Sequence, residues 1–212
     1  MKLELKNISK KFGNTEVLKN VTITMLDGKI YGFIGRNGSG KSVLLKIICG
    51  FYCPSEGTIL LNNENYIENN SFPKNTRALI EKPNFLPDLT GFENLELLAS
   101  IQNKIDSDKI TNILKELNLE LEMNKKYSKY SLGTKQKLGI AQVLMEDPDL
   151  IILDEPFNGV EEETVKKIRT ILQQEKKKGK IIIIASHIKE DIDILADEVY
   201  QVDAGNVKRR SV

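Results

Sequence analysis

Histidine, cysteine and tryptophan are almost missing from the 212 residues, which contain one histidine, two cysteines and no tryptophan. Cys49 and Cys53 are separated by three residues, with no second cysteine pair and no histidine nearby. A structural zinc site needs four ligands at defined spacings, so this pair is too small to form one. We expect both cysteines to be reduced and to serve as packing residues.

An excess of charge of either sign is also missing, because 31 Lys and Arg residues face 30 Asp and Glu residues, a net charge of +1. No overall basic bias therefore points to nucleic acid or anionic lipid as a partner. The most strongly apolar run, around Ile181–Ala185, is far shorter than the roughly 18 residues of a membrane-spanning helix. The first residues, MKLELK, lack the apolar core of a signal peptide. We expect a cytosolic chain that binds no nucleic acid.

The pattern of apolar residues predicts an α/β fold with two kinds of strand. Alternation in Leu3–Lys6 and Val21–Met25 is typical of half-buried antiparallel strands. More continuously apolar strands are expected at Lys29–Ile34, Leu150–Leu153, Ile181–Ile184 and Glu198–Val202. Because helical patterns alternate with the later strands, we expect a mostly parallel sheet with helices on both faces.

Residues 84–147 differ from the rest, because helical patterns follow one another there without a clear strand. We interpret this stretch as an α-helical subdomain inserted into a single domain that spans residues 1–212. Residues 1–83 and 148–212 would then form the N-terminal antiparallel β subdomain and the parallel core. A chain of 212 residues with 40% apolar content is large enough for one such domain.

Gly35–Ser42, GRNGSGKS, matches the phosphate-binding pattern G-x-x-x-x-G-K-[ST] at every fixed position. An apolar strand precedes it and a predicted helix follows it, as this motif requires. Glycines let backbone N–H groups approach anionic oxygens, and the helix adds the positive end of its dipole. Lys41 would reach the β- and γ-phosphates of a nucleotide, and Ser42 would give a hydroxyl to Mg²⁺. The sequence therefore predicts a P-loop nucleotide site.

Two adjacent carboxylates, Asp154 and Glu155, come directly after the apolar strand Leu150–Leu153. A carboxylate at the end of a buried strand is held rigidly, which makes Asp154 the candidate ligand for Mg²⁺. Glu155 points elsewhere because it is the next residue, and it is the candidate to orient and deprotonate an attacking water. The alternative is that Asp154, Glu155 and Pro156 form only a turn that ends a strand.

Tyr130–Gln136, YSLGTKQ, lies before the helix that leads to the Asp154 strand. It looks like the signature Leu-Ser-Gly-Gly-Gln, and with the motifs above it makes the chain resemble the nucleotide-binding subunit of ATP-binding-cassette (ABC) transporters over essentially its whole length. The resemblance implies that Ser131 and Gly133 cap the γ-phosphate of ATP held by a partner subunit. It also implies ATP and Mg²⁺ as cofactors and a homodimer that forms head to tail with ATP.

This chain departs from the family pattern in its signature and in a later loop. Tyr130, Leu132 and Thr134 stand where the signature has Leu, Gly and Gln, and Glu161 stands where a later loop has Asp. We expect a helix from Thr134 onward, with its positive end facing the anion. In the family these two segments make contacts between the subunits of the dimer, so we expect those contacts to be altered in this chain.

Three further residues take their roles from the resemblance. Phe12 lies where the family places an aromatic ring that stacks on adenine; alternatively it is an apolar contact at a strand end. Glu81 replaces a Gln at the hinge into the helical subdomain, where it can still approach Mg²⁺ but only as an acceptor. His187 lies at the position of the family's switch histidine, which would donate to the γ-phosphate and orient the water and Glu155. The alternative for His187 is a residue at the edge of the core.

The site expected from the sequence has three parts. The expected catalytic residues are Lys41, Glu155 and His187. The expected metal ligands are Ser42, Asp154 and Glu81. The expected nucleotide contacts are Phe12, Gly35, Asn37, Gly38, Ser39, Gly40, Lys41, Ser42, Val43, Ser131 and Gly133.

The resemblance implies an ATPase subunit that lies on the inner face of the cell membrane and powers a separate transmembrane permease. Residues 79–95, LIEKPNFLPDLTGFENL, are similar to subunits of bacterial exporters that give bacitracin-type and lantibiotic self-protection. One alternative is a soluble ABC-superfamily ATPase of translation or DNA repair, which usually has a second cassette or a long coiled coil. Another is a P-loop small-molecule kinase, which needs an acceptor pocket and lid arginines.

Overall fold

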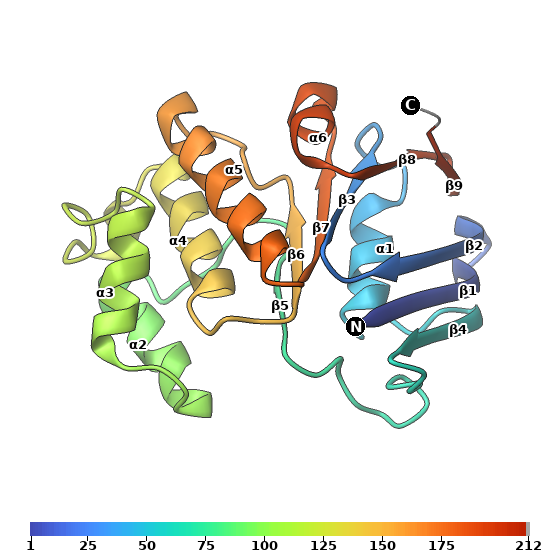
Figure 1. The fold of residues 1–212 in the computed structure, drawn as a ribbon, viewed down its shortest axis with the longest axis horizontal. Coiled ribbons are helices and arrows are strands. Elements are labelled where there is room, and N and C mark those ends of the chain that lie inside the picture. The colour runs from blue at the N-terminus through green and yellow to red at the C-terminus, as the bar shows by residue number, and fades with distance from the viewer. Residues whose placement is uncertain (211–212) are drawn as a thin grey trace.

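Two β-sheets form the frame of the computed structural model, which describes residues 1–210 (Figure 1). The smaller sheet has the order β2-β1-β4, and all its neighbouring strands are antiparallel. Its strands are β1 (Lys2–Phe12), β2 (Thr15–Leu26) and β4 (Glu56–Leu61). In β1 and β2, Leu3 pairs with Met25 and Leu5 with Ile23, and all four side chains are buried. The alternation in the sequence therefore predicted these strands correctly.

The larger sheet has six strands in the order β5-β6-β7-β3-β8-β9. The first five are parallel to one another, and β9 is antiparallel to β8. The strands are β3 (Lys29–Ile34), β5 (Thr76–Leu79), β6 (Leu150–Asp154), β7 (Ile181–Ser186), β8 (Glu198–Asp203) and β9 (Asn206–Arg209). The strand of four isoleucines lies between β6 and β3 and is buried along its whole length. The carboxyl ends of β3, β6 and β7 therefore meet at one edge.

Helices cover both faces of the larger sheet (Figure 1). On one face, α1 (Lys41–Ile48) lies between the two sheets, and its apolar side belongs to the same buried cluster as the smaller sheet. On the other face lie α4 (Leu132–Leu144), α5 (Glu162–Lys177) and α6 (Lys189–Leu195). This arrangement confirms the expected α/β class, with an antiparallel sheet beside a mostly parallel one.

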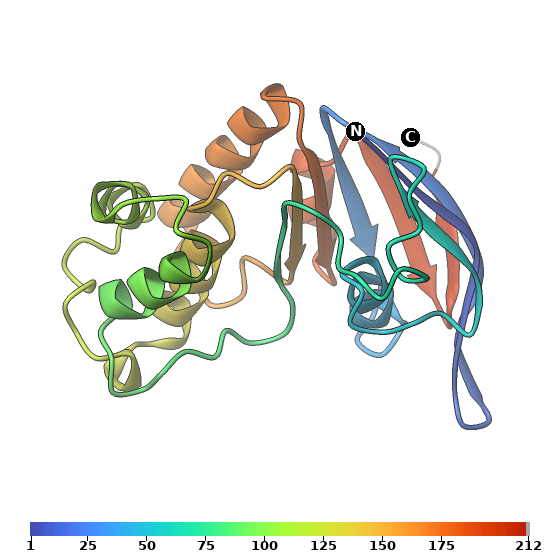
Figure 2. The same ribbon diagram turned by 90° about the horizontal axis from the view of Figure 1, so that it is seen from below.

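The helical segment predicted from residue 84 onward contains α2 (Gly91–Gln102), α3 (Ser107–Glu116), the 3₁₀ turn η1 (Tyr127–Lys129) and α4. It lies to one side of the larger sheet (Figure 2). Helix α2 begins at a capping box, in which Thr90 accepts from the Glu93 N–H and Glu93 accepts from the Thr90 N–H. Leu95, Leu114 and Leu138 share one buried cluster with residues of β6 and β7, so the segment packs directly on the core. No helix within residues 1–210 is long and apolar enough to cross a membrane.

Candidate functional site

The predicted phosphate loop joins the end of β3 to the first turn of α1. Two of its glycines are required by close backbone contacts: a Cβ at Gly35 would lie 2.3 Å from the Val202 carbonyl oxygen. Gly40 has φ of 112°, and a Cβ there would lie 2.9 Å from the Val17 carbonyl oxygen. The loop borders a hollow of about 410 Å³, whose lining is Val17, Asn37, Gly38, Gly40, Lys41, Ser42, Val43, Asp154 and Glu155. The structure therefore brings most of the expected phosphate contacts together with both carboxylates.

The side chain of Lys41 is folded back against the loop. Its Nζ donates to the carbonyl oxygens of Gly35, at 2.7 Å, and Arg36, at 3.2 Å. The same nitrogen lies 3.7 Å from Glu155 Oε1, and only 5% of the side chain is exposed. A buried cation held mainly by neutral carbonyls can form stronger bonds with anionic oxygens placed in the same hollow.

Ser42 and Asp154 meet at the end of β6, where the Ser42 hydroxyl donates to Asp154 Oδ2 at 2.5 Å. Asp154 Oδ1 is buried and has no hydrogen-bond partner among residues 1–210. Burial raises the pKa of Asp154 above its ordinary value, partly offset by the bond from Ser42, while the nearby Glu155 carboxylate raises it further. A hydroxyl beside an unpartnered carboxylate oxygen fits Mg²⁺, which prefers hard oxygen ligands.

The described part of the chain holds no cluster of three or more His, Cys, Asp or Glu side chains suited to a metal ion. Mg²⁺ usually takes one or two protein ligands and completes its shell with water and substrate phosphates. The pair formed by Ser42 and Asp154 is therefore compatible with a metal that arrives together with the nucleotide.

Glu155 and His187 lie side by side at the ends of β6 and β7. The Glu155 N–H donates to the Ala185 carbonyl at 2.8 Å, which joins the two strand ends, and Glu155 has φ of 49°. Glu155 Oε2 lies 2.8 Å from His187 Nδ1 and accepts from the Ser186 hydroxyl at 3.2 Å. The carboxylate thus faces the hollow from one side and the imidazole from the other, so that it can orient a water and take its proton.

Comparison with known proteins gives one consistent answer. Residues 18–158 match the family model described as ABC transporter. An uncharacterized ABC transporter ATP-binding protein of Bacillus subtilis, YybJ, is 41% identical over 206 residues, which cover 97% of this chain and 94% of that protein. The chain belongs to the ABC transporter family. It is an ATP-binding, ATP-hydrolysing subunit of that family.

Two other ABC relatives carry more specific names. The bacitracin transport ATP-binding protein BcrA of Enterococcus faecalis is 36% identical over 207 residues, which cover 97% of this chain and 67% of that protein. The lantibiotic transport ATP-binding protein SrtF of Streptococcus pyogenes is 31% identical over 205 residues, which cover 97% of this chain and 88% of that protein. Among solved structures, the dimeric ATP-binding cassette MJ0796 bound to ADP and Pi has a TM-score of 0.88 at 25% identity, covering 99% of this chain and 98% of that one.

The segment expected to be the ABC signature caps helix α4. Ser131 is the N-cap and its side chain accepts from the Thr134 N–H at 3.1 Å, so the helix begins at Leu132, two residues before the start expected from the sequence. A Cβ at Gly133 would lie 2.2 Å from the Gly159 carbonyl oxygen, because the signature packs against the loop that follows Glu155. Ser131 and Gly133 lie outside the residues that line the hollow at the phosphate loop.

Phe12 and Glu81, expected to contact adenine and metal in this ABC cassette, point to other partners. Phe12 is 44% exposed and lies edge-on to Tyr52, with ring centroids 5.5 Å apart. Glu81 Oε1 accepts from Lys46 Nζ at 2.5 Å. The structure therefore does not bring the Glu81 carboxylate to the Ser42–Asp154 pair.

Three residues of the site were missed by the sequence analysis. Gln136 donates from Nε2 to the Glu155 carbonyl at 3.0 Å, Ser186 donates to the Glu155 carboxylate, and Val17 lines the hollow. The available signal for Gln136 was its helical spacing, three residues after Gly133 and four before Ile140, which places a polar side chain on a buried face. Such a side chain needs an internal hydrogen-bond partner.

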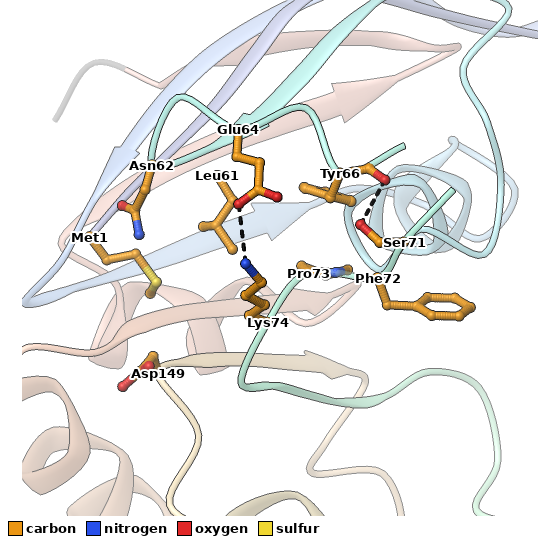
Figure 3. A pocket seen from close by; sticks show the side chains of 10 residues that line it. All are labelled: Met1, Leu61, Asn62, Glu64, Tyr66, Ser71, Phe72, Pro73, Lys74 and Asp149. Carbon is orange, nitrogen blue, oxygen red and sulfur yellow. Dashed lines mark hydrogen bonds and ion pairs between the residues drawn. The ribbon is translucent and has the colours of Figure 1, made fainter. Parts of the chain in front are cut away.

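A second hollow, of about 230 Å³, lies near Met1, Tyr66, Phe72 and Asp149 (Figure 3). Asp149 directly precedes β6, so this hollow lies at the edge of the sheet opposite the phosphate loop. None of the residues expected to bind nucleotide or metal lines it. A Glu64–Lys74 ion pair of 3.4 Å crosses it.

Proposed function

We propose that this chain is the ATP-hydrolysing subunit of a bacterial exporter and that it powers a separate transmembrane permease. The observation that carries the hydrolytic part is the 2.8 Å contact between Glu155 Oε2 and His187 Nδ1, beside the Lys41 amine. Support for the exporter part comes from the full-length similarity to a bacitracin and a lantibiotic transport subunit. The transported compound would then be an antimicrobial peptide or a related antibiotic.

ATP binds, in this proposal, with its phosphates in the loop that precedes α1. The backbone N–H groups of the loop and the positive end of α1 attract the phosphates. Lys41 Nζ leaves the carbonyls of Gly35 and Arg36, which it holds at 2.7 and 3.2 Å, and binds the β- and γ-phosphate oxygens. Ser42 and the Asp154 carboxylate would hold Mg²⁺. When bound, the ion withdraws charge from the phosphate oxygens.

Glu155 and His187 divide the chemistry of hydrolysis. The Glu155 carboxylate orients the attacking water and takes its proton, because among residues 1–210 it is the only carboxylate that lines the hollow apart from the Asp154 metal ligand. His187 Nδ1 donates to Glu155, and its Nε2 donates to a γ-phosphate oxygen when the ring carries protons on both nitrogens. His187 thereby stabilises the charge of the transition state and fixes the carboxylate.

The signature completes the site of a second subunit. Ser131 and Gly133 lie outside the hollow of their own chain, whereas the α4 terminus that they form is suited to an anion. We place them on the γ-phosphate of ATP bound to a partner subunit in a head-to-tail homodimer, and the similar cassette MJ0796 is a dimer. The permease would hold this dimer at the inner face of the cell membrane.

Phosphate release by the purified chain with ATP and Mg²⁺ tests the hydrolytic part, with Glu155→Gln as the matched variant. Loss of the carboxylate lowers turnover about 10²-fold or more, since general base catalysis contributes about 10²–10⁴-fold. The variant still binds ATP, so size exclusion with ATP shows a dimer. A persistent monomer at high protein concentration would count against the sandwich.

Resistance of cells tests the transport part. Cells that express the chain together with a candidate permease should tolerate bacitracin or a lantibiotic better than cells in which the chain carries Glu155→Gln. Equal sensitivity of both strains to every peptide antibiotic tried, with ATP hydrolysis intact in vitro, would refute the exporter proposal and leave the ATPase standing.

A further inference from the structure

Glu81 forms an ion pair that its sequence position does not suggest. Its Oε1 lies 2.5 Å from Lys46 Nζ, and the hydrogen bond between them raises the pKa of Lys46. Lys46 belongs to the last turn of α1, four residues after Ser42. One helical turn, about 5 to 6 Å, therefore separates the Cβ atoms of Lys46 and Ser42. The Glu81 backbone N–H lies close enough to Asp154 to lower the pKa of that carboxyl, so it is the Glu81 side chain that is directed to Lys46. Among residues 1–210, the Glu81 carboxylate accepts its hydrogen bond from Lys46 and not from Ser42.

The Lys46 ammonium leads from this ion pair to an aromatic cluster. It lies 5.5 Å from the centroid of the Tyr52 ring, within range of a cation–π contact. Tyr52 in turn packs edge to face against Phe12, at 5.5 Å and 73°. Lys10 Nζ lies over both rings, 5.0 Å from the centroid of Phe12 and 5.7 Å from that of Tyr52. An unbroken series of contacts thus runs from the hinge to the Phe12 ring, for which the family resemblance implies stacking on adenine.

We propose that Glu81 is a positioning residue, which acts through Lys46 and Tyr52 to hold the Phe12 ring in place for the adenine base. The inference rests on the proposed nucleotide site and adds to it a role for the hinge residue in base binding instead of metal binding. Without the carboxylate, the long Lys46 side chain regains its rotamer freedom and the Tyr52 ring loses a fixed contact.

The size of the effect follows from the exposure of the ion pair. The Glu81 side chain is 64% exposed, and exposed pairs contribute little because water screens them. We therefore expect Glu81→Ala to weaken nucleotide binding about two- to fivefold, with no change in the groups that carry out hydrolysis.

The experiment is calorimetric titration of the purified full chain with ADP, once with Mg²⁺ and once with EDTA. A positioning role predicts that Glu81→Ala weakens ADP binding by the same two- to fivefold factor in both buffers. A metal-ligand role predicts a loss only with Mg²⁺, and that result would overturn the proposal. Sodium triphosphate, which has no base, should bind the variant and the wild type equally, and an equal loss of triphosphate and ADP binding would also overturn it.

Variants of the partner residues separate this role from general destabilisation. Lys46→Met should reproduce the loss of Glu81→Ala, and the two together should lose no more than either alone. The conservative variant Lys46→Arg, which keeps a cation for both Glu81 and the Tyr52 ring, should bind ADP as the wild type does, and a loss of ADP binding in this variant contradicts the proposal. In steady state, Glu81→Ala should raise the KM for ATP and leave kcat within about twofold.

A matched control is Glu64→Ala, which breaks the exposed pair with Lys74 at the opposite edge of the sheet (Figure 3). It should leave ADP binding unchanged. A wild-type chain that neither binds ADP nor hydrolyses ATP would refute the proposed function itself. Normal wild-type activity with a Mg²⁺-dependent defect in Glu81→Ala would refute only the positioning role.

Discussion

Asp154→Asn should stabilise the nucleotide-free protein and, at the same time, remove its response to Mg²⁺. Asp154 is 4% exposed, and its Oδ1 is buried without a hydrogen-bond partner in the described chain. Leaving a buried acceptor unpartnered costs about 1–3 kcal/mol, more when it is charged. An asparagine removes the charge and keeps an oxygen for the Ser42 hydroxyl, while its amide needs a new acceptor, so we expect a net gain of about 1 kcal/mol.

The gain in stability from Asp154→Asn should grow as the pH rises. Burial raises the pKa of Asp154 above its ordinary value of 3.8, so the folded protein holds this proton more tightly than the unfolded chain does. At pH values below the ordinary pKa, Asp154 is neutral in both the folded and the unfolded chain, so its burial carries no cost of desolvating a charge. As the pH rises through the pKa of Asp154 in the folded protein, the buried carboxyl ionises and the free energy of unfolding of the wild type falls. The difference in free energy of unfolding in favour of Asp154→Asn therefore grows until Asp154 is fully ionised.

Thermal unfolding monitored by circular dichroism measures both effects. In EDTA at neutral pH, the melting temperature of the variant should exceed that of the wild type by about 2–4 °C, the shift expected for ~1 kcal/mol in a chain of this size. Saturating ADP with Mg²⁺, at about 100 times Kd, stabilises a binding-competent protein by about 2.7 kcal/mol. The wild type should gain this stabilisation and the variant much less, so that with ADP and Mg²⁺ the wild type has the higher melting temperature. A less stable variant in EDTA, or equal stabilisation by ADP and Mg²⁺, would refute the reasoning.

Two further substitutions test contacts around the site. Gly133→Ala places a methyl group 2.2 Å from the Gly159 carbonyl oxygen, so it should lower the free energy of unfolding by about 1–3 kcal/mol, measured by urea denaturation; an unchanged value would contradict this close approach. Gln136→Leu removes the 3.0 Å hydrogen bond to the Glu155 carbonyl and leaves that oxygen only the longer bond from the Asn158 N–H, at 3.3 Å, which should cost about 1 kcal/mol and lower kcat several-fold. If its turnover matches that of the wild type, Gln136 does not position Glu155.

The sequence was most informative where a long apolar strand fixes the position of the residues at its carboxyl end. The runs at Leu150–Leu153 and Ile181–Ile184 are buried and became neighbouring parallel strands. Because parallel strands end at the same edge, Glu155 and His187 had to lie close together. The phosphate loop was predictable for a similar reason, since close backbone contacts require glycine at Gly35 and Gly40.

Short elements and exposed side chains were predicted less well. Strands β5 and β9 have four residues each, too few to show a period. The start of α4 was predicted at Thr134, two residues late, although Ser131 is a good N-cap residue. The partner of Glu81 was not predictable, since Lys46 is 35 residues away and the pair depends on how the hinge lies on α1.

ATP turnover by His187→Ala is the most direct test of the central claim, that Glu155 and His187 work together on the γ-phosphate. The imidazole lies 2.8 Å from the carboxylate and does not line the phosphate hollow. The account predicts that the variant binds ATP as the wild type does and hydrolyses it about 10²-fold more slowly, the usual cost of one transition-state hydrogen-bond donor. Turnover within about twofold of the wild type would contradict the claim and return His187 to a residue at the edge of the core.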